Sequence, residues 1–272
     1  MAITPAPTFA GSIPENYHRI LGPILFETYA KDMAARLTAL RLPAGARVLE
    51  TAAGSGIVTK SLLGVMPPQS QLLATDLSEP MLTLARGFVP ADPRLTFSQA
   101  DGCALPFKDR EFDAIVCQYG VMFFPDKVKS MQEARRVLKP GGTYLFNVWD
   151  SLERNPIAAA VQTELDAMYP QNPPSFLRKM PFGWSDRAEI ERVVMTGGFE
   201  HVTLTDVAAV CVAADAEKAA RAFVMGTPVA ADLAERKADM EAVVSRVAGV
   251  LAGRFGKSPC RAVMSAVVVE AR

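Results

Sequence analysis

The sequence contains few of the residues on which acid–base and metal chemistry most often depend. Only two of its 272 residues are histidines, His18 and His201, and its four cysteines are scattered without a CxxC pair. A structural zinc site needs Cys and His ligands at close spacing, so we expect no metal site. Unpaired cysteines without a recognisable export signal are typical of a reducing cytoplasm, which is where we expect the protein to reside.

Net charge and long apolar runs are also missing. Lys+Arg and Asp+Glu both number 29, so the formal net charge is +0. Without a positive field over the whole molecule, we expect no nucleic-acid partner. No apolar stretch is long enough to span a bilayer, so we expect no membrane partner either, and the oligomeric state is left open. Hydrophobic residues still make up 50% of the chain, which excludes a disordered or fibrous protein.

Short apolar runs alternate with helical patterns through most of the chain. Runs that end in a polar residue predict strands, and apolar residues spaced three to four apart predict helices between them. Alternation at this pace predicts an α/β fold with a mostly parallel sheet and helices on both faces. The predicted strands are residues 47–50, 71–75, 95–99, 112–117, 143–148, 201–207 and 261–270, and the main predicted helices of the first half are 17–40 (broken near Gly22 and Pro23), 57–63, 79–88 and 127–138.

Three carboxylates follow predicted strands, at the edge where open parallel sheets bind ligands. They are Glu50, Asp76 and Asp101, and the small-residue loop 51–56 comes directly after the first of them. Alanine and glycine in this loop allow the backbone to approach a ligand closely. Glu50 suits an ammonium group and Asp76 can accept hydrogen bonds from a ribose diol, while Asp101 and the backbone after it can bind an adenine amine.

The loop allows two interpretations. A dinucleotide site needs G-x-G-x-x-G and a helix N-terminus that is free to hold pyrophosphate. The loop contains Gly54 and Gly56 but lacks the third glycine of this motif, and the Glu50 carboxylate is poorly suited to a diphosphate. A ligand with adenosine at one end, an amino acid at the other and no phosphate fits better, and that ligand is S-adenosylmethionine. A nucleotide-dependent oxidoreductase is therefore the less favoured alternative.

Five segments between about residues 47 and 149 resemble the class I S-adenosylmethionine-dependent methyltransferases, in particular the small-molecule branch related to the ubiquinone/menaquinone biosynthesis methyltransferases. In order, these segments are VLETAAGSG, LLATDLSEPML, FSQADGCALPF, FDAIVCQYGVMFFPD and EARRVLKPGGTYLFNVW. The resemblance implies a Rossmann-like, doubly wound, mostly parallel seven-stranded sheet with helices on both faces and helical lid insertions. It implies a single domain over residues 1–272, with an N-terminal helical lid at 1–42, a cofactor-binding core at 43–150 and acceptor-lid insertions at 151–184 and 208–259.

The resemblance also implies a set of residues that bind the cofactor. Leu77 and Met81 are expected to sandwich the adenine, while the amide of Gly102 or Cys103 binds a ring nitrogen. Gln118 is expected close to the methionine portion and to the mouth of the acceptor pocket. The full set is Tyr17, Glu50, Ala52, Gly54, Gly56, Asp76, Leu77, Met81, Asp101, Gly102, Cys103 and Gln118.

Ala52 departs from the family pattern, which has glycine at this position. An alanine methyl group is tolerated there if the φ angle is negative. Together with Gly54 and Gly56, Ala52 is expected to supply the close backbone approach. The resemblance implies that Glu50 orients the loop and helps to bind the methionine moiety, and that Tyr17 covers the cofactor.

The expected reaction is methyl transfer to a small, hydrophobic or aromatic acceptor by direct displacement. No catalytic residue is predicted, because the positive sulfur already activates the leaving group and positioning can supply much of the acceleration. The Asn/Asp-Pro-Pro-Tyr signature of nitrogen-base methylation is absent, so methylation of O, C or N in a small molecule stays open. A non-catalytic protein that binds S-adenosylmethionine or S-adenosylhomocysteine is the alternative. Of Phe123 and Phe124, we expect one to line the acceptor pocket and the other to pack in the core.

Overall fold

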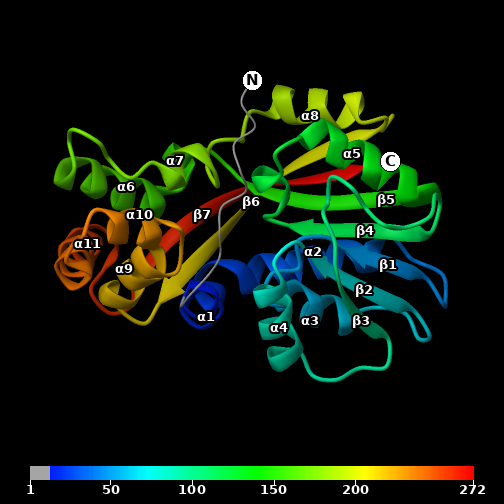
Figure 1. Cartoon of the computed structure of the whole chain (residues 1–272), viewed down its shortest axis with the longest axis horizontal. Coiled ribbons are helices and arrows are strands. Elements are labelled where there is room, and N and C mark those ends of the chain that lie inside the picture. The colour runs from blue at the N-terminus through cyan, green and yellow to red at the C-terminus, as the bar shows by residue number, and fades with distance from the viewer. Residues whose placement is uncertain (1–12) are drawn as a thin grey trace.

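The computed structural model describes residues 13–272, which form one seven-stranded sheet flanked by helices (Figure 1). The strand order is β3-β2-β1-β4-β5-β7-β6. Neighbours from β3 to β5 pair in parallel, while β7 runs antiparallel to both β5 and β6. The predicted mostly parallel seven-stranded sheet is therefore confirmed. The strands are β1 (Arg47–Glu50), β2 (Gln71–Asp76), β3 (Leu95–Gln99), β4 (Phe112–Gln118), β5 (Leu138–Trp149), β6 (Val202–Ala213) and β7 (Cys260–Ala271).

Alternate residues of the central strands feed two hydrophobic cores. Val48 and Val116 face one core, together with residues of α2 (Glu27–Ala39) and α3 (Ile57–Leu63). Leu49 and Ile115 face the other core, together with residues of α5 (Lys127–Val137) and α8 (Arg187–Thr196). Because both faces of the sheet are covered, these strands are apolar at nearly every position, as expected for a buried parallel sheet.

Most of the remaining helices lie at one end of the molecule, at the left of Figure 1, around the outer half of β6 and β7. Helix α11 packs against α6, α9 and β7, and α9 packs against the N-terminal η1. Helix α4 instead packs on β2 and β3. The bounds are α1 (Ile13–Asn16), η1 (Tyr17–Phe26), α4 (Glu79–Phe88), η2 (Val121–Phe123), η3 (Leu152–Arg154), α6 (Pro156–Met168), α7 (Phe176–Lys179), α9 (Ala216–Met225), α10 (Val229–Glu235) and α11 (Met240–Phe255).

The N-terminal helix differs from the prediction. Residues Tyr17–Phe26 form a π-helix, η1, and the change to the α-helix α2 falls at Glu27 instead of near Gly22 and Pro23. Gly22 lies against the start of α3, where a Cβ atom would come within 2.7 Å of Ile57 Cδ1. Pro23 lies inside η1, where its lack of an N–H group removes one helical hydrogen bond.

Two strands, β5 and β6, are longer than predicted by at least five residues. Strand β5 begins at Leu138, and residues 139–142 form an irregularity within it, since Phe112 pairs with Leu138 while Ala114 pairs with Thr143. Strand β6 continues to Ala213, because it pairs with β7 along its whole length. The helical part of the second insertion therefore begins at α9. Within residues 13–272, none of the helices has both the length and the apolar character needed to cross a membrane.

Candidate functional site

A cleft of about 420 Å³ opens at the carboxyl ends of β1, β2, β3 and β4. Most of the residues predicted to bind the cofactor line it, and three of them do not. None of Glu50, Gly56 and Cys103 lines the cleft. Glu50 lies buried at the end of β1, Gly56 is the residue before α3, and the Cys103 thiol donates to the carbonyl of Asp126. The predicted residues in the lining are Tyr17, Ala52, Gly54, Asp76, Leu77, Met81, Asp101, Gly102 and Gln118.

Asp76 joins the loop after β1 to the end of β2. Its Oδ2 atom accepts a hydrogen bond from the Gly54 amide and its Oδ1 atom accepts one from the Ser78 amide, both at 2.8 Å. Burial raises the pKa of Asp76, and the amide hydrogen bonds act in the opposite direction. Each carboxylate oxygen has a further lone pair, so Asp76 can hold the loop and still accept from a ligand in the cleft.

Glu50 is a buried carboxylate with unused hydrogen-bonding capacity. Only 1% of the residue is exposed, and its Oε2 atom has no hydrogen-bond partner among the described residues. Burial raises the pKa of Glu50 to about 8, with a further contribution from the nearby Asp76. A carboxyl group in this state favours a cationic ligand group that would restore its charge and satisfy the free oxygen.

The loop 51–56 has three residues in the left-handed region of φ. Their φ angles are +53° at Ala52, +56° at Gly54 and +84° at Gly56. The expectation of a negative φ at Ala52 is therefore wrong. Its methyl group occupies a space left by Gly120, where a Cβ atom would lie 2.4 Å from the Cβ of Ala52. At Gly56, a Cβ atom would lie 2.5 Å from Val89 Cγ2, so this glycine allows α3 to begin against the end of α4.

One carboxylate oxygen of Asp101 is engaged in a local hydrogen bond with the backbone that follows it. Its Oδ1 atom accepts a hydrogen bond of 2.8 Å from the Cys103 amide, so of the two candidate amides only that of Gly102 lines the cleft. The ring of Phe124 packs on Gly102, where a Cβ atom would lie 2.7 Å from Phe124 Cζ. Leu77 is 55% exposed beside this end of the cleft, whereas Met81 is buried.

Two side-chain hydrogen bonds connect helix η1 to the residues around the cleft. Gln118 Nε2 donates to the carbonyl of Phe26 at 3.3 Å, and its Oε1 atom is buried with no partner among the described residues. His18 Nδ1 lies 2.9 Å from Ser55 Oγ, and the His18 ring stacks on Phe88 at 3.7 Å between centroids. This pairing was not predicted, since nothing in the sequence pattern brings residues 18 and 55 together.

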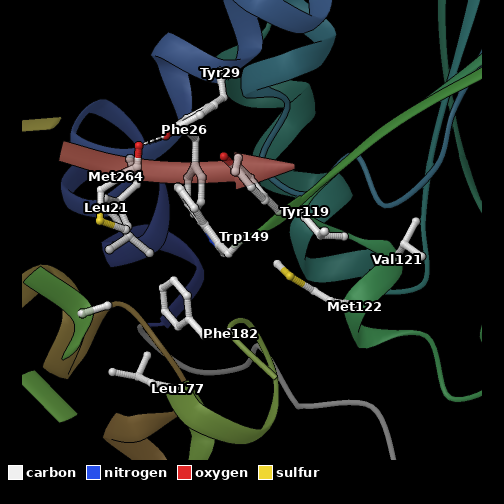
Figure 2. Close-up of a cluster of buried hydrophobic side chains, with 14 of the residues drawn as sticks. Leu21, Phe26, Tyr29, Tyr119, Val121, Met122, Trp149, Leu177, Phe182 and Met264 are labelled. Atoms are coloured by element: carbon white, nitrogen blue, oxygen red, sulfur yellow. Dashed lines mark hydrogen bonds between the residues drawn. The ribbon is translucent and has the colours of Figure 1, made fainter. Parts of the chain in front are cut away.

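An apolar cavity of about 40 Å³ adjoins the cleft. Figure 2 shows the aromatic cluster beside it, in which Tyr119 lies against Trp149 and Phe182 is nearby. The Tyr119 and Trp149 rings stack at 4.0 Å and 10°. The cavity is lined by Tyr17, Leu21, Leu25, Phe26, Tyr119, Met122, Phe123, Trp149, Phe176, Leu177, Pro181, Phe182, Phe223, Thr227 and Pro228.

Both phenylalanines after β4 line the cleft and also pack against the hydrophobic core, whereas we expected one to line the acceptor pocket and the other to pack in the core. Phe123 lines the cavity and the cleft, and Phe124 lines the cleft alone. Tyr119, with a φ of +56°, also lines both spaces and was not among the predicted site residues. Its position directly after Gln118, at the end of a predicted strand, was the available signal.

The sheet order, with a single antiparallel strand at β7, defines the class I methyltransferase fold. Residues 49–146 match a family model described as a methyltransferase domain. This part of the chain is therefore similar to methyltransferase domains, and the sheet has the fold of the class I S-adenosylmethionine-dependent methyltransferases.

Curated relatives and solved structures agree with this assignment. The chain is 36% identical over 106 residues to the ubiquinone/menaquinone biosynthesis C-methyltransferase UbiE of Geobacter sulfurreducens, covering 38% of this chain and 41% of that protein. It is 29% identical to the demethylmenaquinone methyltransferase of Staphylococcus carnosus, covering 48% of this chain and 54% of that protein. The chain thus spans about half the length of the curated relatives it matches.

Among solved structures, the fold is similar to phosphoethanolamine N-methyltransferase 2 of Haemonchus contortus in complex with S-adenosyl-L-methionine. The TM-score is 0.59 at 17% identity, covering 95% of this chain and 56% of that one. A SAM-dependent methyltransferase from Aquifex aeolicus gives a TM-score of 0.53 at 18% identity, covering 70% of this chain and 91% of that one. At these identities the similarity establishes the fold alone.

Proposed function

We propose that this chain transfers a methyl group from S-adenosylmethionine to a small, hydrophobic or aromatic acceptor by direct displacement. The observation that carries the proposal is that a cleft lined by the carboxylates Asp76 and Asp101 adjoins an apolar cavity. When bound, the cofactor supplies an electrophilic methyl group on a positively charged sulfur. We further propose a cytoplasmic location, which the four free thiols support.

The cleft residues fit this cofactor by their chemistry. Gln118, in the cleft lining, and Glu50, buried at the end of β1, each have a buried oxygen without a partner among the described residues. Such oxygens suit the ammonium group of a methionine moiety. Asp76 would accept hydrogen bonds from the ribose diol, and Asp101 with the Gly102 amide would bind the adenine edge. Leu77 and Met81 would contact the adenine faces, and Tyr17 would close the cleft from η1.

The acceptor would occupy the apolar cavity. Residues of η1 and of both insertions contribute to its wall, including Phe182 from the first insertion and Phe223 from the second. A cavity of about 40 Å³ has room for only one or two water molecules, so a ring-sized acceptor requires the helices of the insertions to move outward. The insertions would thereby determine which acceptors enter.

The cavity wall contains no ready general base. In the described part of the chain, its polar side chains are Tyr17, Tyr119, Thr227 and Trp149. The Trp149 indole N–H can only donate, and the Thr227 hydroxyl donates to the Phe223 carbonyl. Burial raises the pKa of both tyrosines, so they stay protonated at neutral pH. We therefore propose that the chain contributes positioning and exclusion of water, and that the acceptor attacks through its own anion or lone pair.

The test combines identification of co-purified ligands with turnover. Mass spectrometry of the purified protein is expected to find S-adenosylmethionine or S-adenosylhomocysteine. Incubation with methyl-labelled S-adenosylmethionine and a panel of phenols, quinols, carboxylates and amines is expected to transfer label to an apolar member. The names of the relatives support including quinone precursors in the panel. Cofactor binding without transfer to any acceptor would instead favour the non-catalytic alternative, and tight NADH binding without S-adenosylmethionine affinity would contradict the proposal.

A further inference from the structure

Residues 170–184, which join α6 to α8 and include α7, form one wall of the apolar cavity, and we call them the gate segment. The rings of Phe182 and Trp149 lie 5.9 Å apart between centroids (Figure 2). Because the cavity has room for only one or two water molecules, a ring-sized acceptor requires a wall to move outward. The residues of the gate segment that line the cavity are Phe176, Leu177, Pro181 and Phe182.

The gate segment is fixed at both ends and bonded to itself in between. At its beginning, α6 packs on α11. Just after its end, Arg187 donates two hydrogen bonds, at 2.6 and 2.8 Å, to the fully buried carboxylate of Asp150. Within residues 13–272, no backbone hydrogen bond joins the segment to a strand of the sheet. It can therefore move outward between its anchors while the sheet stays intact. The amides that donate to carbonyls of the same segment are those of Lys179, Met180, Phe182 and Gly183.

The first part of the gate segment is held by side chains of other helices. Gln162 Nε2 of α6 donates to the carbonyl of Pro174, and Arg236 Nη1, which follows α10, donates to the carbonyl of Asn172, both at 2.7 Å. These hydrogen bonds connect the segment to other parts of the lid. They do not connect it to the cofactor cleft.

The last residue of the gate segment, Trp184, contacts Lys127, the first residue of α5. Lys127 Nζ lies 5.4 Å from the centroid of the Trp184 ring and donates to the carbonyl of Phe124 at 3.1 Å. Within residues 13–272, no carboxylate pairs with Lys127, and burial lowers the pKa of its amine. An ammonium group without a counter-ion gains from the negative face of an aromatic ring, so this contact favours the closed position of the gate segment.

The turn before Lys127 rests on the loop that we expect to bind adenine. The ring of Phe124 packs on Gly102, where a Cβ atom would lie 2.7 Å from Phe124 Cζ. The thiol of Cys103 donates to the carbonyl of Asp126 at 3.4 Å. A cofactor bound against this loop would therefore also fix the turn, including the Phe124 carbonyl that holds the Lys127 ammonium group.

We infer that Lys127 is a positioning residue that couples cofactor binding to closure of the gate segment over the acceptor cavity. It acts through the Trp184 ring and touches neither the cleft nor the cavity. The inference rests on the proposed function, because it takes the loop at Gly102 as the adenine site. Coupling is reciprocal, so the contact that closes the gate segment also tightens cofactor binding.

The test measures cofactor affinity by calorimetry, without any acceptor. Lys127→Met keeps most of the side-chain length and removes the charge, and it is expected to bind S-adenosylmethionine about three- to tenfold more weakly. Lys127→Arg keeps a cation over the ring and is expected to keep the affinity. Lys129→Met is the matched control, because Lys129 lies two residues further along α5 with an exposed side chain, and no change is expected.

A second set of measurements separates the coupling from a structural role of Lys127. Trp184→Leu is expected to weaken cofactor binding to the same extent as Lys127→Met, and the double variant is expected to lose no more than either single variant. Trp184 is the more exposed of the two tryptophans, since Trp149 is buried. Acrylamide quenching of tryptophan fluorescence is therefore expected to decrease when the cofactor binds the unmodified protein, and to stay unchanged in Lys127→Met.

Three results would overturn the coupling. These are unchanged affinity in both single variants, additive losses in the double variant, and quenching that responds to the cofactor equally in Lys127→Met and in the unmodified protein. In each of these cases the unmodified protein still binds S-adenosylmethionine, so the proposed function stands. Failure of the unmodified protein to bind S-adenosylmethionine would instead overturn the proposed function, and the coupling with it.

Discussion

The methyl group of Ala52 and the bare Cα of Gly120 share one space beneath the cofactor cleft. A Cβ atom on Gly120 would lie 2.4 Å from the Cβ of Ala52 and 2.7 Å from the Sγ of Cys117. The loop after β1 can therefore carry alanine with a φ of +53° because the loop after β4 carries glycine opposite to it.

This relationship predicts coupled effects on stability. Gly120→Ala is expected to lower the free energy of unfolding by about 1–3 kcal/mol through overpacking. Ala52→Gly removes a left-handed alanine and is expected to be neutral or stabilising by up to about 1 kcal/mol. Urea denaturation of the double variant is expected to show a smaller loss than the sum of the single changes. Strict additivity would contradict the shared space.

Substitution of Asp76 is expected to affect the cofactor and the loop together. Asp76→Ala removes the acceptor for the Gly54 and Ser78 amides, and calorimetry is expected to show a loss of about 2–4 kcal/mol in cofactor binding. Asp76→Asn retains one acceptor oxygen and is expected to lose less. Glu235→Gln, at an exposed position outside the cleft, serves as the control. Unchanged affinity in Asp76→Ala would remove this residue from the site.

The raised pKa of Glu50 predicts that the stability of the protein depends on pH. Its pKa is raised by burial to about 8, so the native state keeps a proton that the unfolded chain releases near pH 4.5. Stability is therefore expected to fall as the pH rises from 4.5 through 8, and Glu50→Gln is expected to remove this loss. At pH 8.5 the variant should be more stable than the unmodified protein by at least about 1 kcal/mol.

The same carboxyl group predicts proton release on cofactor binding. An ammonium group beside Glu50 favours its charged form, so binding at pH 7 should release a proton. Calorimetry in two buffers with different ionisation enthalpies measures this release directly. Glu50→Gln should bind the cofactor more weakly and release no proton. Equal apparent enthalpies in both buffers for the unmodified protein would contradict this role.

The contact of His18 with Ser55 predicts that η1 loosens from the loop after β1 in acid. Burial lowers the pKa of His18, so the unfolded chain takes up a proton at a higher pH than the native state. The contribution of His18 to stability is therefore complete above its unfolded pKa and is lost as the pH falls. Cofactor dissociation, followed by stopped flow, is expected to accelerate below about pH 6.5. Ser55→Ala should accelerate it at every pH, since the hydrogen bond at 2.9 Å is absent.

The sequence by itself determined the alternating architecture and the position of the acids. Buried parallel strands are apolar at nearly every residue, so each strand is visible as a local run, and Glu50, Asp76 and Asp101 are visible as the polar residues that follow. Parallel strands place their carboxyl ends at one edge of the sheet, which is why the sequence predicts these acids at that edge. Asp76 and Asp101 line the cleft there, and Glu50 lies buried at the end of β1.

Only the tertiary structure shows the backbone conformation and the side-chain contacts around the cleft. The φ of Ala52 depends on the space left by Gly120, and the Cys103 amide is occupied because Asp101 turns back onto it. The hydrogen bond between His18 and Ser55 and the lining of the apolar cavity bring together segments far apart in the chain. Such contacts depend on packing between distant elements and leave no periodic pattern in the sequence, so only the assembled fold shows where the cofactor cleft meets the apolar cavity.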